Sequence, residues 1–310
     1  MQMKKFYLLH QKRLSKVSLG NSRLRTKQMK KTVLLLFLLP TFLFSQEASN
    51  FLPTNKGELI HHTYYSLSYK ENYEHAEWVF YEIKKERILG LVKREDNFRS
   101  DKKISANSAT LSDYKGSGFD RGHLAPAHDF SFSSTAMSES FYMSNMSPQN
   151  PSFNRGIWGN LEKLVRSWGS NSSIYVVTGP ILSSCSSYIG SNKVCVPEYY
   201  YKVIYDPSEK KMIALILPNI KGNQDLDYYV CTVDNLEKRT NIDFFPILED
   251  KIEEKLESEV HKEDWNWIVT TTKYKTENTT LSTQCKGTTQ KRKRCQNKTK
   301  DPSGYCHHHD

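Results

Sequence analysis

The sequence predicts an α+β domain in which the central sheet is mainly antiparallel. Four short segments rich in β-branched and aromatic residues have the composition of strands. Two apolar stripes repeat at spacings of three and four residues, as in amphipathic helices. Strands and helices do not alternate regularly, which argues against a doubly wound parallel sheet. The predicted strands are residues 77–83, 174–178, 200–204 and 212–217, and a turn at 205–208 joins the last two into a hairpin.

The size and composition of the chain suit a soluble globular protein. Its 310 residues are 37% hydrophobic and 12% aromatic, which is enough to bury a core. Charged residues make up 25% of the chain, and no apolar run reaches the roughly 20 residues that a membrane-spanning helix needs. We therefore expect neither a disordered nor a fibrous chain, and no membrane span.

The first 45 residues are predicted to be a basic leader that ends in a signal peptide. They contain ten Lys and Arg residues and no acidic residue. Met29-Lys30-Lys31 precedes a short apolar run, residues 33–44, and Ser45-Gln46 follows it. A basic start, a short apolar run and a small-residue boundary are the features of a secretory signal, so we expect export. Residues 1–28 either extend this signal or lie before a second start at Met29.

The formal charge of +10 is unevenly distributed along the chain. Beyond residue 45 there are 34 basic and 34 acidic residues, so the expected mature chain is formally neutral. Residues 285–310 contribute a net charge of +5, which leaves about −5 for residues 46–284. Attraction to a polyanion must therefore come from local clusters in the body or from the basic tail.

The residues Asp120-Arg121-Gly122-His123 combine three properties that suit phosphodiester cleavage. A histidine can act as a base near neutral pH. An arginine can bind a phosphate through charge-assisted hydrogen bonds, and a glycine lets the backbone approach closely. We therefore place the candidate active site at this motif.

Two further groups of polar residues follow this motif. Asn145 lies in segment 144–149 (SNMSPQ), and Asn154 begins segment 154–158 (NRGIW). An apolar stripe predicts a helix that begins near Asn154 and carries Glu162. Taken alone, Asn154 suits a helix N-cap and Glu162 a solvated helix position. The stripe consists of Ile157, Trp158, Leu161, Leu164, Val165 and Trp168.

In their order and spacing, these residues resemble the DNA/RNA non-specific endonuclease family, which has a ββα-metal active site. The resemblance rests on the DRGH motif at 120–123, the Asn-x-x-Pro-Gln segment at 145–149 and the Asn-x-Gly-x-Trp helix start at 154–158. It covers roughly residues 55–245 and includes neither the leader nor the tail. It implies the ββα-metal nuclease fold and metal-dependent hydrolysis of DNA and RNA.

The resemblance also implies a role for each of five residues. His123 would be the general base that deprotonates the attacking water, Arg121 would bind the phosphate, and Asn145 would brace His123 or its loop. Asn154 would be the direct protein ligand of Mg²⁺, with Mn²⁺ as the alternative ion. Glu162 lies about two helical turns further on, a rise of ~12 Å, so it would contact the metal through water.

Two alternatives stay open at this point. The family uses a further arginine upstream of the motif, and both Arg94 and Arg99 are near the expected place.

The predicted function is an exported, Mg²⁺-dependent endonuclease that acts on DNA and RNA with little sequence specificity. The alternative is a catalytically silent nucleic-acid-binding protein that acts through its basic tail. The intact His123 and Asn154 favour the enzyme.

Export permits disulfides among the six cysteines, three of which lie in the body and three in the tail. Cys185 and Cys195 bracket a loop rich in Ser and Gly, and we expect a bridge between them. Cys231 would then remain a buried thiol.

The body, residues 50–269, is predicted to end at a linker and a small tail. A second apolar stripe, Leu248, Ile252, Leu256 and Val260, predicts a late helix. Residues 270–284 are rich in Thr and poor in apolar residues, as a linker is. The tail, residues 285–310, has almost no apolar side chains and would need a metal or disulfides to fold. Three alternatives stay open for it: zinc bound by Cys285, Cys295, Cys306 and His309, disulfides, or a disordered basic segment.

Overall fold

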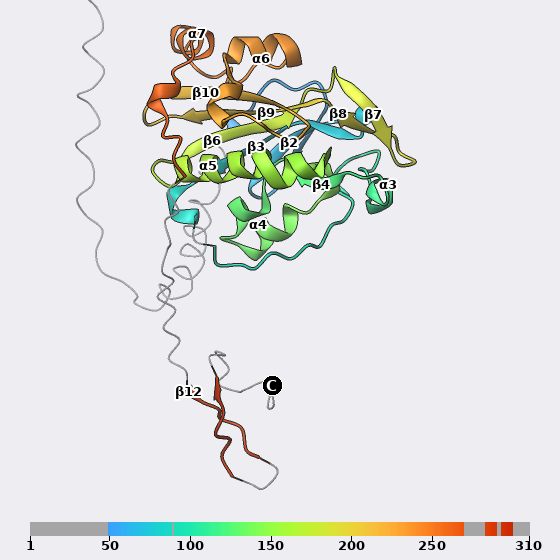
Figure 1. The fold of residues 1–310 in the computed structure, drawn as a ribbon, viewed down its shortest axis with the longest axis vertical. Helices are drawn as coiled ribbons and strands as arrows, with labels where there is room; N and C mark the ends of the chain where they lie inside the picture. Colours follow the sequence, from blue (N-terminus) through green and yellow to red (C-terminus); the bar gives the residue numbers. More distant parts are fainter. Residues whose placement is uncertain (1–48, 89, 270–282, 290–292, 300–310) are drawn as a thin grey trace, which may run out of the picture. The chain divides into compact units, whose positions relative to one another are not determined.

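The computed structural model describes residues 49–88, 90–269, 283–289 and 293–299 (Figure 1). These ranges include the predicted catalytic body except residue 89. The predicted leader and the tail residues Cys306 and His309 lie outside the described residues.

A seven-stranded sheet forms the centre of the body, and every pair of neighbouring strands in it is antiparallel. The strand order is β1-β2-β3-β6-β9-β10-β11. This sheet confirms the predicted α+β class with an antiparallel sheet. The strands are β1 (Glu58–His61), β2 (Tyr65–Lys70), β3 (His75–Ile83), β6 (Ile174–Pro180), β9 (Tyr199–Asp206), β10 (Lys211–Pro218) and β11 (Val230–Cys231).

The four predicted strands all lie in this sheet, within β3, β6, β9 and β10. The turn between β9 and β10 is closed by Asp206, whose Oδ1 accepts hydrogen bonds from the backbone N–H groups of Ser208 (3.0 Å) and Glu209 (3.1 Å). Such a side-chain turn favours a tight reversal of the chain. The hairpin predicted at this position is therefore present.

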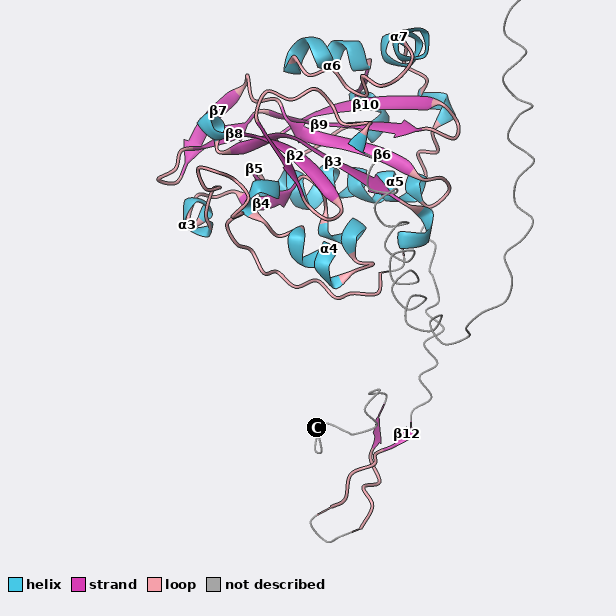
Figure 2. Cartoon of the chain, turned by 180° about the vertical axis from the view of Figure 1, so that it is seen from behind, coloured by secondary structure: helices cyan, strands magenta, loops and turns pink. Residues whose placement is uncertain are grey.

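Helix α5 (Gly159–Gly169) lies across one face of the sheet (Figures 1 and 2). Its residues Leu161, Leu164 and Val165 are buried in one core with Val176 of β6 and Ile204 of β9. Each such side chain stabilises the fold by about 1.5–3 kcal/mol when it is fully buried. The predicted apolar stripe is thus the face that holds the helix on the sheet.

Helices α6 (Val233–Thr240) and α7 (Asp250–Ser258) lie next to each other and contact β10 (Figure 1). The second apolar stripe predicted this late helix only in part. Ile252 and Leu256 lie in α7, whereas Leu248 precedes it and Val260 follows it. The helix ends at Ser258, and the backbone is extended from Glu259.

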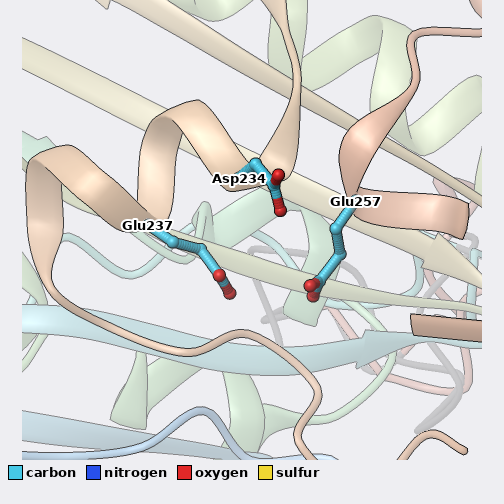
Figure 3. Close-up of side chains that lie close together, drawn as sticks. All are labelled: Asp234, Glu237 and Glu257. Atoms are coloured by element: carbon cyan, nitrogen blue, oxygen red, sulfur yellow. The ribbon is translucent and has the colours of Figure 1, made fainter. Parts of the chain in front are cut away.

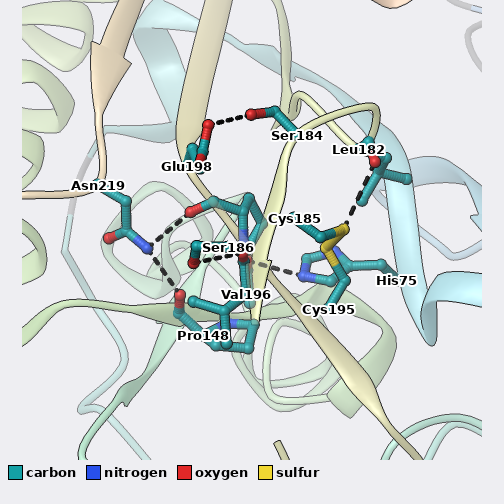
Figure 4. The surroundings of a disulfide bond; sticks show 12 residues. His75, Pro148, Leu182, Ser184, Cys185, Ser186, Cys195, Val196, Glu198 and Asn219 are labelled. Atoms are coloured by element: carbon teal, nitrogen blue, oxygen red, sulfur yellow. Dashed lines mark hydrogen bonds between the residues drawn. A yellow bond between two sulfur atoms is a disulfide. The ribbon is translucent and has the colours of Figure 1, made fainter. Parts of the chain in front are cut away.

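Two small ladders complete the body. Strand β4 (Asp120–His123) pairs with β5 (Met146–Gln149), and β7 (Cys185–Ile189) pairs with β8 (Val194–Pro197). A disulfide between Cys185 and Cys195 joins β7 to β8 (Figure 4). This is the pair that the sequence predicts. Cys231 is half-buried rather than buried, because it lies on the edge strand β11.

The remaining helical segments are short. They include α3 (Leu111–Tyr114), α4 (Ser134–Glu139) and a π-helical segment, Phe153–Trp158, that leads directly into α5. Single turns of 3₁₀ helix lie at Glu71–Tyr73, Lys85–Arg87, Ala127–Phe130, Met143–Asn145, Leu226–Tyr229 and Lys262–Asp264. Among the residues described, no helix is both long enough and apolar enough to cross a membrane.

The described part of the tail forms a hairpin. Strand β12 (Thr283–Gln284) pairs with β13 (Lys298–Thr299), so the ordered tail begins two residues before the predicted end of the linker. The backbone N–H of Cys285 donates to the carbonyl of Asn297, and that of Cys295 donates to the carbonyl of Gly287, both at 2.8 Å. Cys285 and Cys295 are buried together within this hairpin.

Candidate active site

The DRGH motif forms strand β4, which is paired along its whole length with β5. Ser147 of β5 attaches this ladder to the central sheet. Its hydroxyl forms a hydrogen bond with Nε2 of His75 on β3 at 2.9 Å and another with the hydroxyl of Tyr200 on β9. The two strands and α5 together make up a ββα unit whose place on the sheet is fixed by buried polar contacts.

Gly122 and Asn219 hold the far end of this ladder in place. A Cβ atom at Gly122 would overlap the fully buried side chain of Gln149, so only glycine fits here. Nδ2 of Asn219 donates to the carbonyls of Pro148 (3.1 Å) and Pro197 (3.0 Å) (Figure 4). Its Oδ1 accepts from the backbone N–H of Asn150 at 2.8 Å. Asn219 thus ties β5 to β8 just before the π-helical segment begins.

His123 is a nearly buried histidine, with 8% of its surface exposed. Its ring packs against Phe98 and Phe141, with centroid distances of 5.9 and 4.9 Å. Burial, followed by the positive charges of Arg94 and Arg121, lowers the pKa of His123 to about 3. The imidazole is therefore neutral near pH 7. Its buried Nε2 has no hydrogen-bond partner among the described residues.

Asn145 braces the loop that follows His123 and does not bond the histidine itself. Its Oδ1 accepts from the backbone N–H of Ala125 at 2.9 Å, and its Nδ2 donates to the carbonyl of Ala125 at the same distance. Nδ2 also donates to the carbonyl of Ser140 at 2.8 Å. Asn145 is completely buried, so these bonds hold the loop rigidly.

Asn154 lies inside the π-helical segment rather than at a helix N-cap. Such segments are often found at functional sites. Nδ2 of Asn154 donates to Oδ2 of Asp120 at 2.9 Å, which orients the amide and leaves its carbonyl oxygen as the unused ligand atom. Arg155 pairs with the same carboxylate at 2.6 Å. Burial alone would raise the pKa of Asp120, but the hydrogen bonds from Arg155 and Asn154 outweigh it and hold that pKa below its usual value.

Asp120 has a role that its position in the motif does not reveal, because it is bonded to Asn154 and Arg155 from a later segment of the chain. Because Asp120 and His123 belong to the same strand, β4 connects the candidate base to the candidate metal ligand.

Glu162 lies on α5 within a group of buried charged side chains. Lys202 of β9 is completely buried, and its Nζ donates to Oγ1 of Thr178 at 3.2 Å and to the carbonyl of Leu124 at 3.5 Å. Burial raises the pKa of Glu162, against the attraction of Lys202, and it lowers the pKa of Lys202, against the attraction of Glu162. Glu162 is thus not a freely solvated helix residue.

The three arginines near His123 have different surroundings. The Arg121 guanidinium lies 4.3 Å from the ring centroid of Phe98, and that of Arg94 lies 4.9 Å from the ring centroid of Phe141. Both arginines are exposed, and both lower the pKa of His123. Nη1 of Arg99, in contrast, donates to the carbonyls of Ser138 (2.8 Å) and Asn97 (3.1 Å). Nε of Arg94 pairs with Oδ1 of Asp96 at 2.7 Å on the exposed surface. Because Arg94 is exposed and its charge lowers the pKa of His123, whereas Arg99 is half-buried, we favour Arg94 over Arg99 as the residue that binds phosphate.

Several residues of this region carry no motif that identifies a role. Lys202, Asp129 and Arg166 surround Glu162 through the fold rather than through sequence spacing, and Asp129 pairs with Arg166 at 2.6 Å. The one available signal was Lys202, a lysine in a strand of otherwise apolar and aromatic residues. A lysine is rarely buried without polar or charged partners, so a lysine in a buried strand indicates that such partners lie nearby.

Two of the four predicted zinc ligands lie within the described residues. Cys285 and Cys295 lie together in the tail hairpin, and Cys306 and His309 lie outside the described residues. Zinc in the tail therefore stays a prediction from the sequence.

Comparisons with known proteins agree with this geometry. A chain in the crystal structure of the EndoG/EndoGI complex superposes with a TM-score of 0.61 at 28% identity, covering 67% of this chain and 93% of that one. Human mitochondrial endonuclease G is 36% identical over 200 residues, which cover 59% of this chain and 67% of the relative. A nuclease from Nostoc sp. is 36% identical over 211 residues, 63% of this chain and 76% of the relative.

The comparison with protein families decides the assignment. The model of the DNA/RNA non-specific endonuclease family matches residues 46–251, about two thirds of the chain and all of the ββα unit. This chain therefore belongs to the DNA/RNA non-specific endonuclease family, a family of metal-dependent nucleases.

Proposed function

We propose that this chain is an exported, Mg²⁺-dependent endonuclease that cuts the phosphodiester bonds of DNA and RNA with little sequence specificity. The observation that carries the proposal is the place of His123, a neutral imidazole on β4 beside two exposed arginines, Arg94 and Arg121. A neutral imidazole can accept a proton, and the two arginines can hold a phosphate next to it.

His123 would act as the general base. It would accept a proton from the attacking water while the water oxygen bonds to phosphorus and the bond to the 3′ oxygen breaks. The leaving 3′ oxygen would take up a proton from water, which gives a 5′ phosphate and a 3′ hydroxyl. A pKa of about 3 makes the imidazole of the free protein a weak base. A bound phosphate would offset the charges of Arg94 and Arg121, which raises the pKa of His123 and strengthens the base in the complex.

The surroundings of Asn154 fit a hard divalent cation. Asp120 fixes the amide so that its carbonyl oxygen is available, and Mg²⁺ prefers oxygen ligands and keeps most of its waters. Asn154 would hold the ion directly and Glu162 through water, and Mn²⁺ has similar ligand preferences. When bound, such an ion supplies Lewis-acid stabilisation of the phosphate and the leaving oxygen.

Phosphate binding by arginine explains the low specificity that we propose. Arg121 and Arg94 would bind the phosphate through charge, and contacts to phosphate carry no direct information about the base. Both guanidinium groups lie over aromatic rings, which limits their motion. DNA and RNA share the phosphodiester group, so both are expected substrates.

Two observations support export. The sequence before residue 46 has the features of a secretory signal, and the disulfide between Cys185 and Cys195 suits an oxidising compartment. Expression of the full chain in a bacterial host tests this. Recovery of an active protein outside the cytoplasm with an N-terminus near Gln46 is expected, and an uncleaved cytoplasmic protein would contradict export.

The nuclease activity is tested with the chain from residue 46 to 310. We expect it to cut supercoiled plasmid and single-stranded RNA in Mg²⁺, to leave 5′ phosphates, and to be inactive in EDTA. If the protein binds DNA but cuts neither substrate in Mg²⁺ or Mn²⁺, the alternative holds, namely a silent nucleic-acid-binding protein that acts through its basic tail.

A further inference from the structure

A second group of carboxylates lies away from the ββα unit, between α6 and α7. Asp234 and Glu237 come from α6 and Glu257 comes from α7, and their side chains approach one another in the space between the two helices (Figure 3). One oxygen of each carboxylate lies within 4.8 Å of an oxygen of the other two. Three acidic side chains from two helices thus converge on one point.

Glu257 is the unusual member of this group. Only 6% of its surface is exposed, and its Oε1 is buried without a hydrogen-bond partner among the described residues. A buried carboxylate oxygen without a hydrogen-bond partner lowers the stability of the fold, because the hydrogen bonds that it made to water in the unfolded chain are not replaced. Figure 3 shows this carboxylate directed toward those of Asp234 and Glu237. The carboxylate that contains the orphaned atom therefore points toward the other two acids.

The charge of the group is not balanced by the protein. Within the described residues, no hydrogen bond joins the three carboxylates to one another, and the basic partner recorded for them is Lys238, 4.0 Å from Asp234 and largely exposed. Three acidic side chains thus meet at a partly buried place with one exposed lysine beside them. A cation at the centre of the group would give the buried oxygen of Glu257 a partner.

The oxygens are also arranged for access. Oε1 of Glu237 accepts the backbone N–H of Phe244 at 2.8 Å, which fixes this side chain in place. Asp234 and Glu237 are half-buried, so water and ions can reach the group from one side. Ca²⁺ takes six to eight oxygens, tolerates irregular geometry and accepts carboxylates that bind through one or both oxygens. Mg²⁺ needs near-ideal octahedral geometry and gives up its waters reluctantly, which suits this group less well.

We propose that Asp234, Glu237 and Glu257 form a calcium-type divalent cation site that ties α6 to α7. Two or more waters complete the coordination on the exposed side. The site is structural: it holds the two helices together beside β10 and takes no part in phosphodiester cleavage. Glu257 lies on α7, just beyond residue 251, where the match to the family ends.

The test is the effect of Ca²⁺ on thermal unfolding of residues 46–310, measured against EDTA. At Ca²⁺ about 100 times its dissociation constant, we expect the melting temperature of the wild type to rise by roughly 5–10 °C. Glu257→Gln should lose most of this rise. It should nevertheless melt in EDTA at about the wild-type temperature, because a neutral amide of the same shape replaces a buried carboxyl group whose Oε1 has no partner among the described residues. Glu254→Gln, a change on the exposed side of the same helix, is the matched control and should keep the full rise.

Two further measurements make the result decisive. Asp234→Asn replaces a half-buried ligand and should lose the rise in the same way, which covers the case in which Glu257→Gln folds poorly. Calorimetric titration with CaCl₂ should show one bound ion fewer for Glu257→Gln than for the wild type, whatever binds at Asn154. A wild type whose melting temperature does not rise in Ca²⁺ would overturn the proposal. It would mean that the three carboxyl groups do not bind the ion. Equal gains in the wild type and in both variants would overturn it as well.

Discussion

At the scale of single residues, the hydrogen bond between Asp120 and Asn154 organises the candidate metal ligand. Asn154 taken alone suggests a helix cap, and its motif alone suggests a ligand. The structure adds the partner, 34 residues earlier in the chain, that orients the amide. Sequence spacing could not predict this contact, because it depends on how β4 packs against the π-helical segment.

Replacing Asp120 with alanine tests this orienting role. Residues that orient a metal ligand typically change metal affinity or activity by 10–100-fold. We expect Asp120→Ala to lower kcat by about this factor and to raise the Mg²⁺ concentration needed for half-maximal rate. Arg155→Ala is the matched control, because it removes the other partner of Asp120 and keeps the bond to Asn154. An equal loss in both variants would mean that Asp120 acts through its charge rather than through Asn154.

The two upstream arginines differ in what they bind, and the sequence left them equivalent. Arg94 is exposed, pairs with Asp96 at 2.7 Å and lowers the pKa of His123. Arg99 is bound to two carbonyls and lies 4.0 Å from the ring centroid of Tyr142. We expect Arg94→Ala to raise the KM for DNA several-fold and to leave the melting temperature almost unchanged. Arg99→Ala should instead lower the melting temperature. Nicking assays and thermal melts of both variants check this, and the reverse pattern would exchange their roles.

At the scale of elements, the sequence predicted the strands and helices whose positions depend on the periodicity of their own side chains. The strands around the β9–β10 turn and the apolar face of α5 follow from side-chain periodicity, which the core preserves. The length of α7 did not follow, because Val260 continues the apolar spacing after the backbone has left the helix. The irregular segment Phe153–Trp158 was also missed: the apolar stripe continues across it, although the backbone of Gly156 is not helical.

Lys202 couples strand β9 to helix α5 through buried charge. Removing one partner of a buried charged pair typically costs about 3–5 kcal/mol. We expect Lys202→Met to lower the free energy of unfolding by about this amount, because Glu162 and Asp129 would lose a positive neighbour. In a Glu162→Gln background the same change should cost at least about 1 kcal/mol less. Urea unfolding of the four proteins measures this difference, and equal costs in both backgrounds would show that Lys202 acts by packing alone.

At the scale of the whole molecule, the charge distribution explains how the chain beyond residue 45, which is formally neutral, can attract a polyanion. The body carries about −5 overall, yet Arg94 and Arg121 are both exposed beside His123. The sequence predicted that any attraction must be local. It could not say which arginines gather, because they come from different segments of the fold.

The stability of the whole molecule should depend on pH through His123. Its pKa in the folded protein, about 3, lies below its ordinary value of 6.5. Between these values the unfolded chain binds more protons, so the free energy of unfolding falls as the pH drops from about 6.5 toward 3. One group contributes at most about 1.4 kcal/mol per pH unit. Denaturant unfolding between pH 7 and 4 should therefore show a weaker loss for His123→Asn than for the wild type, and parallel curves would contradict the lowered pKa.

The central claim is that neutral His123 is the general base of a metal-dependent nuclease. The most direct test is the single-turnover rate of plasmid nicking by His123→Ala in Mg²⁺, with DNA affinity measured separately in EDTA. We predict a rate 10²–10⁴-fold below wild type with a dissociation constant within about twofold, and a near wild-type rate for His128→Ala, an exposed histidine five residues away. A His123→Ala variant that keeps its rate within tenfold of the wild type would contradict the account and place the base elsewhere.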